Sequence, residues 1–357
     1  MIRFKLQDLS KIAKNISLFT GRTTDVAFRN LTMFTHDGYI QMYGYDGFAY
    51  MWLMIKSAVE MPVMHMDLDE FIRAIDTFQK DEVYMQINQD SVKLTSGDTA
   101  SEIKSKKDTD IYVVELPKTS NAEMAKDKFC RMLDLGTMCA DRTGSEEGMI
   151  LFRAFKDTVA VNSVVINMDS FAASDVEVNG DIYTFMPYQT ARHVFKVTSG
   201  MKHDSIKIFD DGKKLMFYTD NFGFTMPHED GKDSRSIHSE FINYARNVLN
   251  TGNKIEIENS KLEEALDLSV KFARGTSAST YIDMSDELKI LSRTKNDSTN
   301  TIKVCDINTN AGEFKMNIEY LRSFIKRLRT KKYSVYYKKD GVVIMNGSPK
   351  EFIALRR

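Results

Sequence analysis

Apolar residues recur along the chain with two spacings, which predict helices and strands in a regular order. In the N-terminal segment, Leu9, Ile12 and Ile16 fall on one helical face, as expected for a helix packed on a core. Apolar and polar residues alternate at a period of two in 39–45 and 279–284, which is typical of half-buried strands. The segments predicted to be helical are 8–22, 67–80, 126–142, 189–203, 260–274 and 317–332. Because groups of strands follow these helices, the predicted fold class is α+β with antiparallel sheets.

The order of these elements repeats three times. In each copy a Met stands two residues before the first apolar residue of a helix: Met66, Met186 and Met316, spaced 120 and then 130 residues apart. A helix, an alternating strand, a turn and a second strand follow each Met, and a weaker strand–helix pattern precedes each copy. The chain is therefore predicted to contain three repeated domains, each with two helices packed on antiparallel sheets. The predicted domains are 1–120, 121–252 and 253–357.

Charge is distributed unevenly between these elements. The whole chain carries 49 basic and 50 acidic residues, a net charge of −1, which predicts no strong overall attraction to nucleic acid or membrane. The six predicted helices nevertheless contain 21 basic and 12 acidic residues, so the strands and loops carry a net charge of −10. Helices that shared one surface would give that surface a positive charge suited to a phosphate backbone.

The last predicted helix, 317–332, separates its apolar and basic faces most clearly. Its apolar stripe consists of Ile318, Leu321, Ile325 and Leu328. Another face carries Arg322, Lys326 and Arg329 at helical spacing. No recognition-helix, zinc-finger or RNP-type motif accompanies these residues. Binding to DNA is therefore expected to be weak, salt-sensitive and independent of base sequence, because phosphate contacts do not read sequence.

The sequence offers little support for an enzyme, a membrane protein or a disulfide scaffold. Its three cysteines form no CxxC pair and fit a reduced, cytoplasmic protein. The charged N-terminus predicts no signal peptide, and no long apolar run predicts a membrane span. Acidic clusters at 65–70 and 209–214 could hint at metal, but a helix start and a hairpin turn explain them. No P-loop, GxSxG, HExxH or zinc spacing is present, so no catalytic residue, metal or cofactor is expected.

Several stretches resemble the bacterial-type β sliding clamp, the β subunit of DNA polymerase III. In 21–50 an arginine precedes a strand with an asparagine, and a glycine-led strand ends in an aromatic–aspartate pair; these residues are Arg22, Asn30, Gly38, Tyr45 and Asp46. The family's N-x-x-Y-L helix entry is matched by Asn317, Tyr320 and Leu321. Segment 146–155 resembles the strand that opens the second domain's sheet. The resemblance extends over almost the whole chain.

This resemblance implies a ring of two chains, joined head to tail, whose helices line a hole that holds duplex DNA. The ring slides, tethers the DNA polymerase as a processivity factor and performs no catalytic step. The implied partners are duplex DNA, a DNA polymerase, a clamp loader and a second copy of the chain, with no membrane. The residues expected to face DNA are Lys11, Lys14, Arg22, Arg73, Arg131, Arg192, Lys196, Lys271, Arg322, Lys326 and Arg329. Arg22 matches a family residue individually, and helix geometry predicts the others.

The resemblance also implies two protein contacts. Partner proteins would insert short peptides into an apolar pocket between the second and third domains, beside the C-terminus. The residues carried over to this pocket are Asn167, Asp169, Phe171, Ala172, Ile242, Phe352, Ile353 and Leu355. Ile242 is expected in a loop, and Phe352 and Ile353 fit an ordinary final strand equally well. The dimer contact is expected to involve Ile103 and Lys104 of an edge strand and Phe272 of the partner chain's third domain.

Two other functions are compatible with parts of this pattern. An enzyme would depend on the acidic clusters and would show an activity that requires a divalent metal. A structural or assembly protein, such as a viral or scaffold ring built from β-rich repeats, would not need basic helices on one surface. Tethering of DNA by a closed ring would distinguish a clamp from both.

Overall fold

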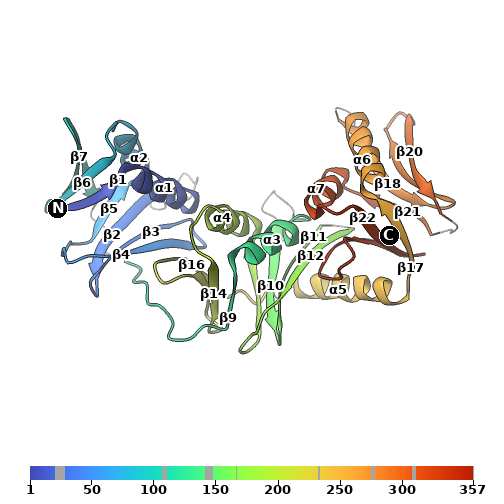
Figure 1. Ribbon diagram of the computed structural model, residues 1–357, viewed down its shortest axis with the longest axis horizontal. Coiled ribbons are helices and arrows are strands. Elements are labelled where there is room, and N and C mark those ends of the chain that lie inside the picture. Colours follow the sequence, from blue (N-terminus) through green and yellow to red (C-terminus); the bar gives the residue numbers. More distant parts are fainter. Residues whose placement is uncertain are drawn as a thin grey trace. The chain divides into compact units, whose positions relative to one another are not determined.

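The fold is seen in a computed structural model, which describes residues 1–20, 29–106, 111–140, 148–165, 167–231, 234–274, 278–307 and 311–356. Two compact units divide the chain: Met1–Lys126 with Lys196–His228, and Asp127–Phe195 with Glu229–Arg357. Antiparallel sheets and helices build each unit (Figure 1), which confirms the predicted α+β class. The two units are a different partition from the three predicted domains, and the threefold division stays a prediction.

Six times in the described ranges, a strand leads into a helix with at most one residue between them. These pairs are β1 (Ile2–Lys5) and α1 (Leu6–Ile16), β5 (Met64–Asp67) and α2 (Leu68–Asp76), β9 (Ala122–Ala125) and α3 (Lys126–Gly136), β13 (Ile182–Pro187) and α4 (Tyr188–Ser199), β17 (Asn253–Glu258) and α6 (Asn259–Ala273), and β21 (Gly312–Met316) and α7 (Ile318–Leu328). Met66, Met186 and Met316 are all buried near the ends of their strands. The predicted strand–helix repeat is therefore confirmed.

The first unit is built on a twelve-stranded antiparallel sheet with the order β1-β6-β7-β8-β5-β2-β3-β4-β16-β15-β14-β9. Its remaining strands are β2 (Asn30–His36), β3 (Tyr39–Tyr45), β4 (Tyr50–Lys56), β6 (Glu82–Ile87), β7 (Ser91–Ser96), β8 (Thr99–Lys106), β14 (Ser205–Asp210), β15 (Lys214–Tyr218) and β16 (Phe222–Pro227). The pairing of β4 with β16 joins two distant parts of the sequence. The buried Trp52 indole strengthens it by donating a hydrogen bond of 3.0 Å to Thr225.

Helices α1 and α2 each bury one face in the first unit. The buried residues are Leu9, Ala13 and Ile16 in α1, and Leu68, Phe71, Ala74 and Ile75 in α2. A short 3-10 turn, Ser17–Phe19, follows α1. Asp67 caps α2, because its carboxylate accepts a hydrogen bond of 3.1 Å from the backbone N–H of Glu70. This cap accounts for one member of the acidic cluster at 65–70.

The second unit contains an eight-stranded and a four-stranded antiparallel sheet. The larger sheet has the order β13-β10-β11-β12-β24-β23-β22-β17, and the smaller has the order β20-β19-β18-β21. The strands not yet given are β10 (Met149–Phe155), β11 (Thr158–Val165), β12 (Met168–Asp175), β18 (Ser279–Met284), β19 (Glu287–Arg293), β20 (Thr299–Asp306), β22 (Lys332–Lys338), β23 (Gly341–Met345) and β24 (Glu351–Arg356). Strand β24 pairs with β12 and β23, so it is an interior strand of the larger sheet.

Helix α5 (Ser234–Thr251) is the largest departure from the sequence prediction. The segment was expected to be a loop, but Phe241, Ala245 and Val248 are fully buried at helical spacing and pack with strands β11, β22 and β23. Figure 1 shows α5 on the opposite side of the second unit from α7. No helix in the described ranges is both long enough and apolar enough to cross a membrane.

Helix α7 confirms the predicted apolar stripe but ends earlier than expected. Asn317 caps it by accepting hydrogen bonds of 3.1 and 3.3 Å from the backbone N–H groups of Glu319 and Tyr320. The predicted stripe is buried, together with Phe324. Arg329 adopts a left-handed conformation with φ of 49°, which ends the helix at Leu328 rather than at 332.

Close contact between α3 and β11 depends on a glycine. A Cβ atom at Gly136 would lie 2.5 Å from the carbonyl oxygen of Val161 and 2.8 Å from its Cβ atom. Because both atoms belong to a buried strand, a larger side chain would force the helix away from the sheet.

We therefore expect Gly136→Ala to lower the free energy of unfolding by about 2 to 3 kcal/mol, measured by urea denaturation. Gly200→Ala is the matched control after α4, since its Cβ atom would be 3.6 Å from the nearest atom, the Val197 carbonyl oxygen. The control is expected to change stability by less than about 1 kcal/mol. Equal stability of both variants would contradict the close contact.

Candidate functional site

In the first unit, the predicted DNA-facing residues include two lysines with partners inside the protein. Lys14 lies 3.6 Å from the Asp76 carboxylate, so α1 and α2 share an ion pair. The Lys11 ammonium donates a hydrogen bond to the carbonyl oxygen of Gly200, just beyond α4. A lysine at a helix C-terminus satisfies a free carbonyl group and stabilises the helix dipole. Arg73 and Lys196 are exposed, and Arg22 lies outside the described residues.

In the second unit, one carboxylate connects three helices. Asp134 of α3 accepts a hydrogen bond of 3.0 Å from Arg192 of α4. Its other oxygen lies 2.9 Å from the Nε atom of Arg327 on α7. Arg192 was predicted to face DNA, but the sequence prediction did not include Arg327 or Asp134. We name these three residues the Asp134 cluster.

A second carboxylate holds two of the predicted cations on α7. Asp267 of α6 accepts a hydrogen bond from Arg322, and the Lys326 ammonium lies 2.9 Å from the same carboxylate. Burial alone would raise the pKa of Asp267, but the hydrogen bonds from the two cations outweigh it and lower this pKa below its ordinary value. Asp267 is therefore ionised at neutral pH. We name these three residues the Asp267 cluster.

The other predicted cations of the second unit have different surroundings. Arg131 of α3 forms a two-pronged ion pair with Glu351 of β24, with an Nη2–Oε2 distance of 2.6 Å. This geometry ties the helix to the C-terminal strand and suits a structural role. Lys271 and Arg329 are exposed, and within the described part of the chain neither has an ion-pair partner.

The residues predicted to form a peptide pocket are mostly buried in the sheet of the second unit. Phe171 and Phe352 stack with ring centroids 4.8 Å apart, where β12 pairs with β24. Ala245 and Val248 of α5 pack against this pair in one apolar cluster. Ala172, Ile353 and Leu355 are almost fully buried in the same two strands. Ile242 packs with Leu151 and Phe185, on α5 rather than in the expected loop.

Asp169 lies in a buried polar network instead of at a surface. Asn162 donates hydrogen bonds to Asp169 Oδ1 at 3.3 Å and to His238 Nδ1 at 2.9 Å. The other carboxylate oxygen, Asp169 Oδ2, is buried without a hydrogen-bond partner among the described residues. Burial raises the pKa of Asp169 to about 7, despite the opposing effects of Asn162 and Arg153. Burial, reinforced by Arg153, lowers the pKa of His238 to about 4.

Among the predicted pocket residues, Asn167 lines a cavity. This cavity, about 410 Å³ in volume, lies wholly within the second unit beside the start of α7. Its polar lining residues are Asn167, Ser279, Thr280, Lys315, Asn317 and Tyr320, and its apolar ones are Val165, Met168, Ala273, Ala278, Met316 and Ile318. The N-x-x-Y-L helix entry supplies Asn317 and Tyr320, so this motif marks the cavity better than the other predicted pocket residues did.

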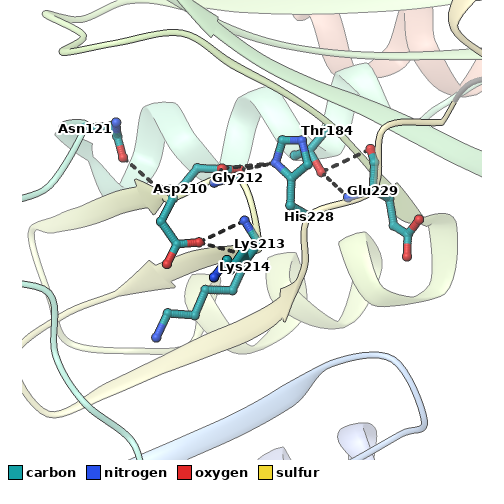
Figure 2. Close-up of polar contacts among 9 residues, drawn as sticks. Asn121, Thr184, Asp210, Gly212, Lys213, Lys214, His228 and Glu229 are labelled. Atoms are coloured by element: carbon teal, nitrogen blue, oxygen red, sulfur yellow. Dashed lines mark hydrogen bonds and ion pairs between the residues drawn. The ribbon is translucent and has the colours of Figure 1, made fainter.

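The second acidic cluster forms a turn, as predicted. Asp210 accepts a hydrogen bond of 2.7 Å from the backbone N–H of Gly212 (Figure 2). Asp211 accepts two hydrogen bonds of 2.9 Å from the backbone N–H groups of Lys213 and Lys214. The His228 ring nitrogen Nδ1 lies 2.8 Å from Asp210 Oδ2. The described residues contain no group of three or more side chains that could hold a metal ion.

Comparison with solved structures identifies the fold. The DNA polymerase III β subunit of Thermotoga maritima matches with a TM-score of 0.82 at 11% identity, over 99% of this chain and 98% of that chain. The β subunit of Pseudomonas aeruginosa matches with a TM-score of 0.82 at 13% identity, with the same coverage. The DNA polymerase sliding clamp of Bacillus subtilis has a TM-score of 0.79 at 10% identity, with coverage of 99% and 97%.

The chain has the β sliding-clamp fold. The resemblance that the sequence predicted is therefore confirmed for the fold over nearly the full chain. No protein-family model and no curated protein sequence matches this chain. The low identities show how far the residues of a sliding-clamp fold can change while its backbone is kept.

Within this sliding-clamp fold, the predicted dimer residues differ in exposure. Strand β8 pairs with β7 along its length but with β5 at only two positions, so 99–104 have a free edge among the described strands. Lys104 is exposed, whereas Ile103 has only 3% of its surface exposed and belongs to the chain's own core. Phe272 is half-buried on α6. The free edge supports the predicted edge strand, and the dimer contact stays a prediction.

The buried network around Asp169 predicts a dependence of stability on pH. Its carboxyl group holds a proton in the folded state up to about pH 7 but loses it near pH 4 when unfolded. Stability from this group is therefore lost as pH rises from 4 to 7, at a cost of up to about 4 kcal/mol. The charged Arg153 lies near both Asp169 and the neutral His238, and Arg246 lies near Arg153.

We expect Asp169→Asn to raise the free energy of unfolding by about 2 to 4 kcal/mol more at pH 8 than at pH 4. Urea denaturation at the two pH values measures this difference. Asp175→Asn is the control on the same strand, because its carboxylate is exposed and pairs with Lys350. The buried network is contradicted if Asp169→Asn and Asp175→Asn show the same pH dependence.

Proposed function

We propose that this chain is a DNA sliding clamp, which closes as a head-to-tail pair of copies into a ring around duplex DNA. The ring would tether a replicative DNA polymerase as a processivity factor and would act without a catalytic step. The observation that carries this proposal is the match of fold over 98% or more of both chains to DNA polymerase III β subunits. As a replication protein, it would work in the cytoplasm with a polymerase and a clamp loader.

Exposed cations on the helices support the DNA contact. Arg73, Lys196, Lys271 and Arg329 are exposed on or just after helices α2, α4, α6 and α7. The Asp134 and Asp267 clusters add four cations that remain partly accessible. Lysine and arginine contacts to phosphate are weak individually and blind to sequence, which is what a ring that slides requires.

The cavity beside α7 supports a binding site for partner peptides. Its lining combines apolar residues such as Met168 and Ile318 with polar ones such as Asn317 and Tyr320. Pockets of this size and mixed lining suit one or two apolar side chains and a few hydrogen bonds from a peptide. Partner proteins would therefore bind beside Asn167, while α5 covers the aromatic pair farther along the same sheet.

A ring that carries no DNA is the alternative function, as in a structural or assembly protein. Light scattering of the chain, combined with retention on circular and linearised DNA, separates the two functions. A sliding clamp is expected to have the mass of two copies, to stay on nicked circular DNA after loading and to leave linear DNA through its ends. A single-copy mass, or equal retention on both DNAs, would contradict the clamp.

Reversing charge on α7 is expected to weaken DNA retention without unfolding the protein. Arg322→Glu with Lys326→Glu places two acids beside Asp267, on side chains that are only partly buried. We expect DNA affinity to fall at least about tenfold, while the free energy of unfolding changes by less than about 1 to 2 kcal/mol.

The control for this variant is Lys213→Glu with Lys214→Glu, which makes the same change in net charge on the β14–β15 turn. DNA binding by salt titration and urea denaturation are measured for both variants. Loss of DNA binding by the turn variant as well would show that net charge, rather than the helix surface, controls binding.

A further inference from the structure

Asp134 and Asp267 occupy the same position in two of the strand–helix repeats. Each is the ninth residue of its helix, α3 or α6. Asp134 pairs with Arg192, the fifth residue of α4, and Asp267 pairs with Arg322, the fifth residue of α7. In both cases the arginine lies on the helix of the next strand–helix pair along the chain. Because the pair recurs at matched helical positions, it is a built feature of the fold rather than one chance contact between surface side chains.

Each carboxylate is shared by two cations. Asp134 holds Arg192 and Arg327, and Asp267 holds Arg322 and Lys326. Each cluster therefore carries a net charge of +1 where its two cations alone would carry +2. A phosphate that approaches either cluster meets half the charge that the basic residues would otherwise present.

Partial exposure leaves these clusters open to exchange. The side chains of Asp134 and Asp267 are 22% and 37% exposed, and those of their four cations are between 28% and 39% exposed. Ion pairs at this level of exposure add little to stability. Solvent or a phosphate can reach the guanidinium and ammonium groups without unfolding any element.

We propose that Asp134 and Asp267 are internal counter-ions that limit how strongly the helix surface holds DNA. This inference rests on the proposed clamp function. The carboxylates fix the cations at the surface, and a phosphate must displace a carboxylate to make its contact. When the phosphate leaves, the carboxylate takes back its cations. At each contact the cation exchanges a carboxylate for a phosphate, so the net gain in binding free energy per phosphate is small. The ring can therefore move along the duplex.

The counter-ions also set the salt dependence of binding. A cation that is already neutralised by a carboxylate releases fewer ions from DNA when it contacts phosphate. Freeing one cation is expected to steepen the slope of log affinity against log salt by up to about 0.9. Removing one carboxylate adds one unit of positive charge to its cluster, so the slope should steepen by up to about 0.9.

The test compares the full chain with Asp134→Asn and Asp267→Asn for binding to a short linear duplex between about 50 and 200 mM salt. Each variant is expected to bind about tenfold more tightly at the lower salt concentration and to show the steeper slope. Asp267→Glu keeps the carboxylate and should behave as the wild-type chain. Asp220→Asn is the matched control, because this exposed carboxylate pairs with Lys207 on β14 and its loss changes net charge equally.

Asp267→Asn combined with Arg322→Gln removes one acid and one base, so its slope should return to that of the wild-type chain. This double variant keeps the inference testable if Asp134→Asn unfolds. An unchanged slope in Asp267→Asn, or an equal change in Asp220→Asn, would overturn the inference and leave the clamp function standing. Equal retention of the wild-type chain on circular and linearised DNA would overturn the proposed function, and the inference with it.

Discussion

The junction between a strand and the helix that follows it constrains this molecule more than any other feature. Because at most one residue separates them, the helix starts where the strand ends. No loop joins them that would allow the helix to pack against another surface. It must turn its apolar stripe to the core beside its own strand, as the buried residues of α2 and α7 do. The basic residues of these helices are then left on the outer faces, so the position of the charge follows from the position of the apolar stripe.

The outer faces of the helices within each unit are less positive than their arginines and lysines suggest. Carboxylates on neighbouring helices neutralise part of this charge, and the Lys11 ammonium donates a hydrogen bond to the carbonyl oxygen of Gly200, just beyond α4. A protein that grips a fixed DNA site gains from every added phosphate contact. The sliding clamp proposed above would have the opposite requirement, because each strong contact is a barrier to the next step. The partly neutralised helix faces fit that proposal.

The parts of the fold that depend on local spacing are predictable from the sequence. The three methionines, the stripe of α7 and the turn at Asp210 were all predicted, because period, caps and turn residues act over a few positions. Helix α5 was missed although Phe241, Ala245 and Val248 have helical spacing.

The candidate site was predicted less well. Ion pairs such as Asp134 with Arg327 join residues nearly two hundred positions apart, and no local pattern indicates them. The burial of Asp169 likewise depends on α5 and β24 together.

The pairing of β4 with β16 has a consequence for how the protein is made. The first unit consists of Met1–Lys126 and Lys196–His228, so its sheet is incomplete until the second segment has been synthesised. At about 5 to 20 residues per second, a ribosome needs roughly 5 to 20 seconds to add residues 127–228, which complete the second segment. During that interval the edge of β4 and the indole of Trp52 lack their partners. An unpaired strand edge with an exposed aromatic ring is a site for association with other chains. During this interval, nascent copies of this protein therefore depend on chaperones, or on a low local concentration of other copies, to avoid pairing with one another.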